Sequence, residues 1–316
     1  VASGFNGGQM KKILLRVLLV LAVVVVVLNW TWARLPAEPP LPPGSKFALV
    51  DGRKIHYVEK PGSGPAGVMI HGLPGTWGDW NAVAAELKGR RTIQIDRAGY
   101  AFSQEGYVPF AEQVQLVHRL TQKLGLKKPV IAGHSYGGAM ALSYASLYPG
   151  DASGIVAVDP AVSPDDIQLK RKIQARFTKI MELPVLHQLG VLTCSNLIRK
   201  SGLMVGGTEA FSPDARDQGW LDRGLSLTAR FRDLVAMADE MLAAQDALTT
   251  LQGQFKSIER PVQIVQGNDD KLVPASSVVA ASKTIPGAQL TMLPGGHMQT
   301  YVHPGEVVAA IRRSTR

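Results

Sequence analysis

The segment Gly133-His134-Ser135-Tyr136-Gly137-Gly138 restricts the fold more than any other part of this sequence. It follows a short apolar run at 129–132 and precedes a stretch of small and apolar residues with the length of a helix. Gly-x-Ser-x-Gly between a strand and a helix places the serine on a sharp turn with a strained backbone. Glycine at 133 and 137 removes the Cβ atoms that would clash across this turn. The motif therefore predicts an α/β sheet with a nucleophilic serine, Ser135, at its edge.

Short apolar runs alternate with helical patterns along residues 47–316. Several runs are continuous and β-branched, which is typical of strands buried on both faces of a parallel sheet. The expected strands cover residues 47–50, 54–59, 67–70, 92–95, 129–132, 154–158, 261–266 and 288–293. The expected helices cover residues 111–124, 135–148, 274–285 and 304–313. This order predicts a doubly wound α/β sheet with helices on both faces.

The alternation stops between Ser163 and Lys256. This stretch has no clear strand pattern, but amphipathic patterns occur near 165–181 and 227–251. Because the sheet pattern resumes after it, we expect a helical cap, residues 163–256, inserted into an α/β core formed by 47–162 and 257–316. A basic run in the cap is compatible with a solvated helix face or with contact to an anionic bilayer. This run consists of Lys170, Arg171, Lys172, Arg176 and Lys179.

Residues 13–33 form an apolar stretch that only Arg16 and Asn29 interrupt. At about 1.5 Å per residue, a helix of this length spans the hydrocarbon layer of about 30 Å. Trp30 and Trp32 lie where an interfacial aromatic belt is expected. Lys11 and Lys12 precede the stretch within a basic tail, 1–12, so the positive-inside bias places the bulk of the chain outside the cytoplasm.

This stretch is either a transmembrane anchor or a signal segment. Thr31-Trp32-Ala33 is compatible with the small-x-small cleavage site of a secretory signal. Both interpretations export the globular part, which is membrane-anchored on the outer, periplasmic or extracytoplasmic side, or secreted after cleavage. The following residues, 34–46, contain five prolines within nine positions and predict a stiff, polyproline-like linker.

Composition and charge exclude several classes of protein. The chain of 316 residues is 46% hydrophobic and 19% charged, which excludes a disordered chain. Its one cysteine, Cys194, excludes an intrachain disulfide framework and a cysteine-based zinc cluster. The net charge is +9, but +4 of it lies before Phe47. Because no basic stripe with interleaved aromatic residues occurs, we expect no nucleic-acid partner.

A second motif, His71-Gly72-Leu73-Pro74-Gly75, follows the expected strand 67–70. A loop at this place can present the N–H of Leu73 to an oxyanion, with the N–H of Tyr136 as the second donor. We interpret His71 as a structural histidine that holds this loop in place.

Adjacent aspartates, Asp269 and Asp270, follow the expected strand 261–266. Functional groups of a parallel sheet gather at the carboxyl ends of its strands. Adjacent side chains of an extended segment diverge, so only one carboxylate reaches a histidine. We favour Asp270 and keep Asp269 as the alternative, and either one can cap the helix that starts near Pro274.

His297 lies on a glycine-rich loop, Gly295-Gly296-His297-Met298, after the last expected strand. It can lie over Ser135 and transfer the proton of its hydroxyl group. His303 directly precedes Pro304 at the start of the last helix, and we interpret it as a surface residue. Ser135, Asp270 and His297 therefore follow one another in the chain order of one hydrolase architecture.

From Phe47 to about Arg313 the chain resembles the α/β-hydrolase superfamily. The resemblance rests on HGLPG at 71–75, DRAGYAFS at 96–103, GHSYGG at 133–138, GNDDKLVP at 267–274 and GGHM at 295–298. It implies an eight-stranded, mostly parallel sheet with a helical cap after strand 6, a catalytic triad of Ser135, His297 and Asp270, and no cofactor. The family's acid motif, with the aspartate four residues before the proline, also favours Asp270, and Asp96 is expected to be structural.

The HGxPG loop is similar to that of epoxide hydrolases and haloalkane dehalogenases, which have an aspartate where this sequence has Ser135. Epoxide hydrolases also have ring-opening tyrosines in the cap, whereas all seven tyrosines here lie outside 163–256. We therefore expect a serine esterase that forms an acyl-enzyme with a small or lipid-like ester. Thioesterase, lactonase, carbon–carbon bond hydrolase and perhydrolase activities remain alternatives, epoxide hydrolysis is disfavoured, and a non-catalytic ligand-binding protein is a further alternative. No clustered His/carboxylate set predicts a metal.

Overall fold

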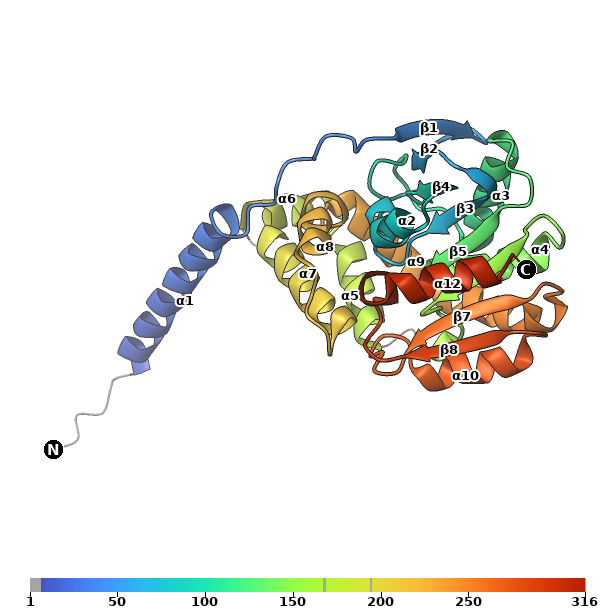
Figure 1. Ribbon diagram of the computed structural model, residues 1–316. Helices are drawn as coiled ribbons and strands as arrows, with labels where there is room; N and C mark the ends of the chain where they lie inside the picture. The colour runs from blue at the N-terminus through green and yellow to red at the C-terminus, as the bar shows by residue number, and fades with distance from the viewer. Residues whose placement is uncertain (1–6, 167–168, 194, 316) are drawn as a thin grey trace.

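An eight-stranded sheet forms the centre of the computed structural model, which describes residues 7–166, 169–193 and 195–315 (Figure 1). Its strands lie in the order β1-β2-β4-β3-β5-β6-β7-β8. β2 runs antiparallel to both β1 and β4, and the other neighbours are parallel. The strands are β1 Ser45–Val50, β2 Arg53–Lys60, β3 Ser63–Ile70, β4 Arg90–Ile95, β5 Val130–His134, β6 Gly154–Val158, β7 Val262–Gly267 and β8 Gln289–Leu293.

Helices cover both faces of the sheet. Along β5, Val130 and Ala132 belong to an apolar cluster with residues of α2 and α12. Ile131 lies between them and belongs to a cluster with residues of α3, α4 and α10. Each central strand therefore buries both of its faces, which explains its continuous apolar sequence. The core helices are α2 Asn81–Glu86, α3 Phe110–Lys123, α4 Tyr136–Leu147, α10 Ala275–Thr284, α11 Gln299–Val302 and α12 Pro304–Arg313.

The predicted α/β fold is confirmed, and all eight expected strands are present. The largest difference is at β3, which begins at Ser63 because an irregular pairing with β4 precedes the regular register from Gly67 onward. The sequence did not predict α2 or three helices of the cap, α6 to α8. α2 is only six residues long, too short for a helical period to be visible.

Five helices lie between β6 and β7: α5 Leu169–Ile180, α6 Pro184–Thr193, α7 Ser195–Phe211, α8 Gln218–Arg223 and α9 Phe231–Gln254. A π-helical turn, Gly224–Thr228, joins α8 to α9. The described part of this insertion contains no strand. It covers the sheet edge at which the parallel strands end, since the N–H of His297 donates to the carbonyl oxygen of Ala210 in α7 at 2.9 Å.

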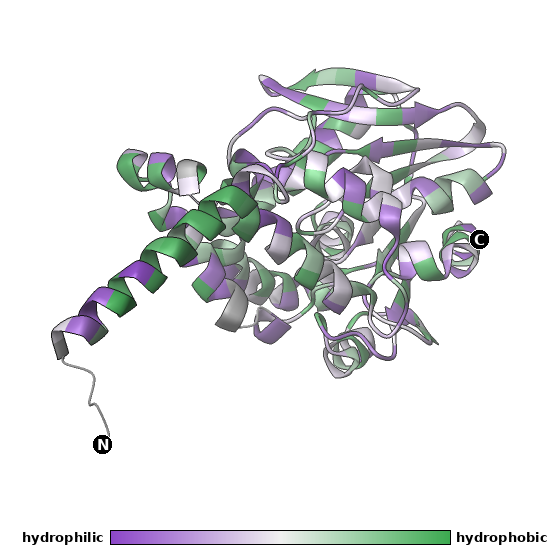
Figure 2. Cartoon of the chain, turned by 90° about the vertical axis from the view of Figure 1, so that its left-hand side faces the viewer, coloured by the Kyte–Doolittle hydropathy of each residue, from purple (hydrophilic) through white to green (hydrophobic). Residues whose placement is uncertain are grey.

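One apolar helix, α1 (Gly7–Trp30), projects away from the globular part (Figures 1 and 2). Among the described residues it is the one helix that is long and apolar enough to cross a membrane, with a mean hydropathy of 2.8. It begins earlier than the predicted residue 13 and includes Lys11 and Lys12 of the predicted tail 1–12, because unbranched side chains such as lysine are good helix formers. It ends at Trp30, before the predicted Ala33.

Candidate active site

Ser135 lies on a tight turn between β5 and α4. Its backbone φ is +56°, in the left-handed region that residues other than glycine rarely adopt. A Cβ atom on Gly133 would lie 1.9 Å from the carbonyl oxygen of Gly137, and one on Gly137 would lie 2.4 Å from that of Ile70. These close backbone contacts require both glycines, as the sequence predicts. The N–H of Ser135 donates to Val158 of β6 at 2.9 Å, which fixes the turn to the neighbouring strand.

Two hydrogen bonds join Ser135, His297 and Asp270. Nε2 of His297 lies 2.8 Å from Oγ of Ser135, and its Nδ1 lies 2.7 Å from Oδ2 of Asp270. The three residues follow β5, β8 and β7, so the edge of the sheet brings together positions that lie far apart in the chain. The structure thus places the predicted His297 next to Ser135 and the predicted Asp270 next to His297.

The carboxylate of Asp270 is buried and surrounded by donors. Oδ1 accepts the N–H groups of Leu272 at 2.8 Å and Val273 at 2.9 Å, and Oδ2 accepts Nε2 of Gln266 at 3.1 Å. Burial by itself raises the pKa of Asp270, but His297 and the two backbone donors outweigh it and hold the pKa below its ordinary value. The ionised carboxylate accepts a hydrogen bond from the protonated Nδ1 of His297, which leaves Nε2 as the acceptor facing Ser135.

Asp269 and His303, the two alternatives, lie away from Ser135. Asp269 is exposed, and its N–H donates to Gly295 at 3.0 Å, so it supports the turn before His297. Nε2 of His303 lies 3.2 Å from the carbonyl oxygen of Pro294, at the start of α12. Both residues therefore have local structural contacts.

Leu73 and Tyr136, the predicted backbone donors, line the same cavity as Ser135. Tyr136 is the first residue of α4, so its N–H belongs to the helical turn that has no intrahelical acceptors. The loop before Leu73 lies against the serine, since a Cβ atom on Gly72 would be 2.9 Å from Cβ of Ser135. Leu73 and Tyr136 therefore both border the space beside Ser135.

His71 is fully buried and holds its loop, as the sequence predicts. Its Nδ1 lies 2.8 Å from the carbonyl oxygen of Gly72, and its Nε2 accepts the N–H of Arg97 at 3.0 Å. Burial, together with the charge of Arg97, lowers the pKa of His71 well below its usual value. Asp96 is structural too: it accepts the N–H of Trp77 at 2.8 Å and lies 2.7 Å from Nδ1 of His56.

A cavity of about 620 Å³ opens above Ser135 and His297. The sheet side contributes Leu73, Tyr136 and further core residues such as Leu272 and Met298, and the cap contributes the facing wall. Apolar side chains dominate its cap wall: Phe177, Met181, Ile198, Leu203, Val205, Trp220, Phe231, Leu234, Met237 and Met241. The volume is sufficient for a medium-sized apolar ligand.

A family model described as the alpha/beta hydrolase fold matches residues 68–304. The chain belongs to this family. This α/β hydrolase is 26% identical over 289 residues to an uncharacterised protein of Mycobacterium tuberculosis, with 88% of this chain and 83% of the relative covered. It is 25% identical over 300 residues to a monoacylglycerol lipase (abhd6-B) of Xenopus laevis, covering 90% and 84% of the two chains. A solved structure of a bacterial membrane phospholipase A has the same fold, with a TM-score of 0.65, 20% identity, and 96% and 97% of the chains covered.

Sequence reasoning missed Asp159, which follows β6 in this α/β hydrolase. Its oxygens accept the N–H groups of Gly267 at 2.9 Å and Gln299 at 3.1 Å, so it links the turn before Asp270 to the loop of His297. Burial, and next the charge of Asp270, raises the pKa of Asp159 well above its usual value. An aspartate directly after an apolar strand was the available signal.

Asp159, His134 and His297 are grouped closely enough to hold a metal ion. However, protein hydrogen bonds engage both oxygens of Asp159 and both ring nitrogens of His297. Nε2 of His134 donates to the carbonyl oxygen of His297 at 2.8 Å. These bonds account for the cluster as a support for the loop that carries His297.

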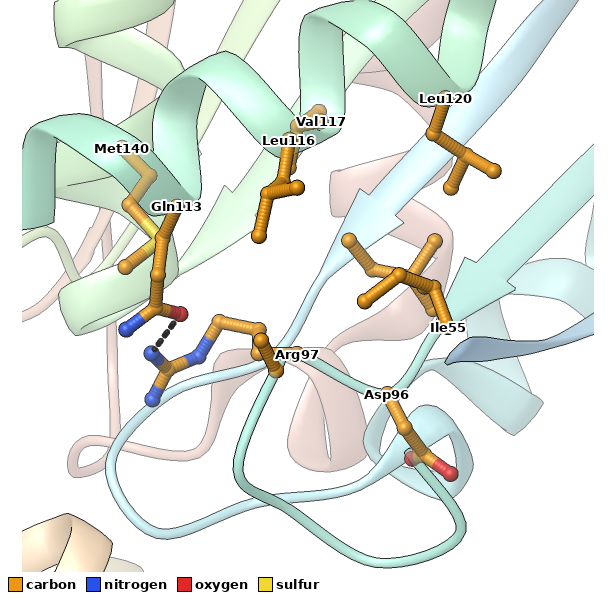
Figure 3. Close-up of a pocket in the computed structure, with 10 residues that line it drawn as sticks. Ile55, Asp96, Arg97, Gln113, Leu116, Val117, Leu120 and Met140 are labelled. Atoms are coloured by element: carbon orange, nitrogen blue, oxygen red, sulfur yellow. Dashed lines mark hydrogen bonds between the residues drawn. The ribbon is translucent and has the colours of Figure 1, made fainter. Parts of the chain in front are cut away.

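Sequence reasoning also missed a buried ion pair between the core and the cap. Arg97 donates to Glu240 of α9 through Nη1 at 2.8 Å and Nη2 at 3.0 Å. Nη1 also donates to Gln113 of α3 at 2.8 Å (Figure 3). Gln113 in turn contacts Glu240. The small cavity beside them measures about 20 Å³, which holds about one water molecule and is too small for a substrate. We therefore interpret the ion pair as a link that holds α9 on the core.

Proposed function

We propose that the protein is a membrane-anchored serine hydrolase that cleaves carboxylic esters of lipid-like molecules through an acyl-enzyme. The observation that carries this proposal is the continuous hydrogen-bonded chain from Asp270 through His297 to Ser135, at the base of a large apolar cavity. Lipase and phospholipase names among the similar proteins support a lipid-like substrate. An ester group at Ser135 leaves its apolar chain in contact with the cap.

In the acylation half-reaction, Oγ of Ser135 bonds to the carbonyl carbon of the ester while Nε2 of His297 takes the hydroxyl proton. The carbonyl electron pair moves to the oxygen, which the N–H groups of Leu73 and Tyr136 stabilise. Asp270 stabilises the positive charge on His297. The bond to the alcohol oxygen then breaks, and His297 returns its proton to the leaving alcohol.

In the deacylation half-reaction, His297 takes a proton from water as the water oxygen bonds to the acyl carbon. The second tetrahedral intermediate collapses, the bond to Oγ of Ser135 breaks, His297 returns its proton to Oγ, and the carboxylic acid leaves. Protons and electron pairs balance between the side chains and water, so this route uses only groups of the chain and needs no cofactor.

The proposal includes a domain organisation with four parts. Residues 13–33 anchor the protein, 34–46 form a linker, 163–256 form the cap, and 47–162 with 257–316 form the catalytic core. Lys11 and Lys12 before the span, with Arg16 near its start, place the N-terminus in the cytoplasm by the positive-inside bias, which puts the catalytic core outside. Trp30 and Trp32 lie at the outer interface in this orientation.

Covalent labelling of Ser135 tests the proposal. Wild-type protein is expected to react with a fluorophosphonate and to hydrolyse a p-nitrophenyl butyrate ester. Ser135→Ala is expected to abolish labelling and to lower kcat/KM by about a thousandfold or more. Ser146→Ala, on the partly exposed side of the same helix, is the matched control and should change neither.

Two outcomes contradict the proposal. Full turnover by purified Ser135→Ala protein refutes the serine mechanism. Absence of labelling in the wild-type protein, combined with reversible binding of a long-chain ester, points to a non-catalytic ligand-binding protein. A panel of esters, thioesters, lactones and epoxides then identifies the bond that is cleaved.

A further inference from the structure

Asn29, near the outer end of α1, is completely buried against the cap. Its Oδ1 accepts the N–H groups of Asn196 at 2.8 Å and Leu197 at 3.1 Å, in the first turn of α7. Its Nδ2 donates to the carbonyl oxygen of Val191, in the last turn of α6, at 3.3 Å. One side chain of the apolar helix thus bridges two helices of the cap.

These contacts give hydrogen-bond partners to backbone groups at the helix ends that a helix cannot satisfy by itself. The first N–H groups and the last carbonyl groups of a helix have no intrahelical partner. Asn29 supplies the acceptor that an N-cap residue gives to the start of a helix, and a donor for the end of the preceding one. An asparagine within an apolar span is costly unless its amide is paired, and the cap provides that pairing.

Further contacts join the residues after α1 to the cap. Nζ of Lys200 donates to the carbonyl oxygen of Trp32 at 2.6 Å and lies 4.2 Å from the centre of its indole ring. Ala33 is completely buried, and Glu38 forms an ion pair with Arg230 at 2.7 Å. The end of the candidate membrane span is therefore part of the folded globular structure.

Exposed apolar side chains gather on the cap helices beside this contact. On α6, Val185 is 70% exposed, Leu186 37% and Leu189 53%. α6 and α7 both lie against α1, as Figure 1 shows, so these side chains lie beside the end of the candidate membrane span. The exposed large apolar residues of the neighbouring cap elements are Ile173, Phe177, Ile180, Leu183, Val191, Ile198 and Val205.

Three of these exposed residues, Phe177, Ile198 and Val205, also line the cavity above Ser135. The apolar surface near the membrane span and the wall of the cavity therefore share side chains. Attraction between basic residues and lipid headgroups does not explain this surface, because two lysines of α5 are engaged within the protein. Lys172 bonds to Gln245, and Lys179 pairs with Asp239. The side chains of Lys170 and Arg171, in the basic run that is compatible with a solvated face or with an anionic bilayer, lie outside the described residues.

We propose that the cap is seated on the membrane that α1 crosses, with α6 inserted at the lipid surface and Asn29 fixing the cap to the anchor. The occupant of the apolar surface is the bilayer itself, because the surface continues directly from the end of the span. The entry route rests on the proposed ester hydrolysis: the lipid substrate enters the cavity from the bilayer between α5, α6 and α7. The anchor is a retained part of the folded protein in this arrangement.

Site-specific photocrosslinking tests the seating independently of activity. The full chain is reconstituted in phosphatidylcholine vesicles, with and without phosphatidylglycerol, and carries Leu189→p-benzoylphenylalanine on α6 or Leu49→p-benzoylphenylalanine on β1. Both leucines are exposed, 53% and 61%, so Leu49 is a matched control. A lipid adduct is expected at position 189 in both lipid mixtures and not at position 49. Asn29→Ala is expected to reduce the adduct at position 189 severalfold.

A hydrolysis assay then tests the entry route. Leu189→Asp is expected to lower turnover of a long-chain lipid ester in vesicles by about tenfold, because it removes an apolar contact with the bilayer. Its turnover of a soluble short ester should match wild type, and Leu49→Asp should match wild type on both substrates. Unchanged turnover of the vesicle ester by Leu189→Asp overturns the entry route.

Three results overturn the membrane seating: no lipid adduct at position 189, a crosslink to a second copy of the chain at that position, or membrane-purified protein that lacks the residues before Ala33. A lipid adduct at position 189 in a protein that hydrolyses no ester supports the seating and refutes the proposed function alone. The two proposals therefore fail separately.

Discussion

Asp270→Asn should remove most of the activity by reversing one hydrogen bond. The N–H groups of Leu272 and Val273 both point at one side of this residue, so the amide oxygen of the asparagine must stay there. The amide nitrogen then faces Nδ1 of His297, 2.7 Å away in the native protein, and donates to it. The imidazole must carry its proton on Nε2, so it can no longer accept the proton of Ser135.

The magnitude follows from this change of tautomer. Loss of the correct tautomer in a Ser-His-Asp site lowers kcat by about 10⁴-fold, the measured figure for the serine protease that serves as the reference case. That factor corresponds to about 5.5 kcal/mol of transition-state stabilisation. The new amide nitrogen also faces Nε2 of Gln266, so two donors meet and Gln266 loses one of its three acceptors, which costs about 1–3 kcal/mol of stability. The variant should therefore fold, with a lowered Tm.

The assay is kcat/KM for a soluble p-nitrophenyl ester, together with a circular dichroism melt of the same protein. Asp269→Asn is the matched control, because Asp269 is the exposed neighbour and should leave kcat/KM within about twofold of wild type. A loss of less than tenfold in folded Asp270→Asn protein would refute the tautomer argument. An equal loss in Asp269→Asn would transfer the role to the neighbouring residue.

Four further substitutions test the surrounding structure. Glu240→Leu leaves the buried charge of Arg97 unpaired and should lower stability by about 3–5 kcal/mol in urea unfolding, whereas Arg97→Met combined with Glu240→Leu should lose much less. Gly137→Ala forces a Cβ atom to within 2.4 Å of a carbonyl oxygen of β3, and the resulting shift should lower kcat/KM by about a hundredfold. Burial raises the pKa of Asp79 to about 6 in the folded protein, so the unfolded chain releases this proton at a lower pH than the folded chain does. Stability should therefore fall as the pH rises from about 4 to 6. Asp79→Asn should flatten this slope in pH-dependent melts.

Local sequence patterns predicted the strands and the three residues at the sheet edge, because each depends on a short segment. The turn around Ser135 needs its two glycines in sequence, and the strand ends fix where Asp270 and His297 emerge. Patterns did not predict Asp159 or the pair of Arg97 with Glu240, since these contacts join segments more than 100 residues apart. Asn29 was visible only as an interruption of an apolar stretch, because its partners lie in the cap.

The contact between α7 and the His297 loop has a consequence for enzyme redesign. The N–H of His297 is held by the carbonyl oxygen of Ala210, and α9 is held by Arg97 in the core, so the cap cannot lift as a unit without disturbing the reacting groups. Substrate preference is therefore better altered at a cavity-lining side chain of α5, such as Phe177, than by moving the whole cap. Grafting a foreign cap as one piece should instead give a folded but inactive chimera.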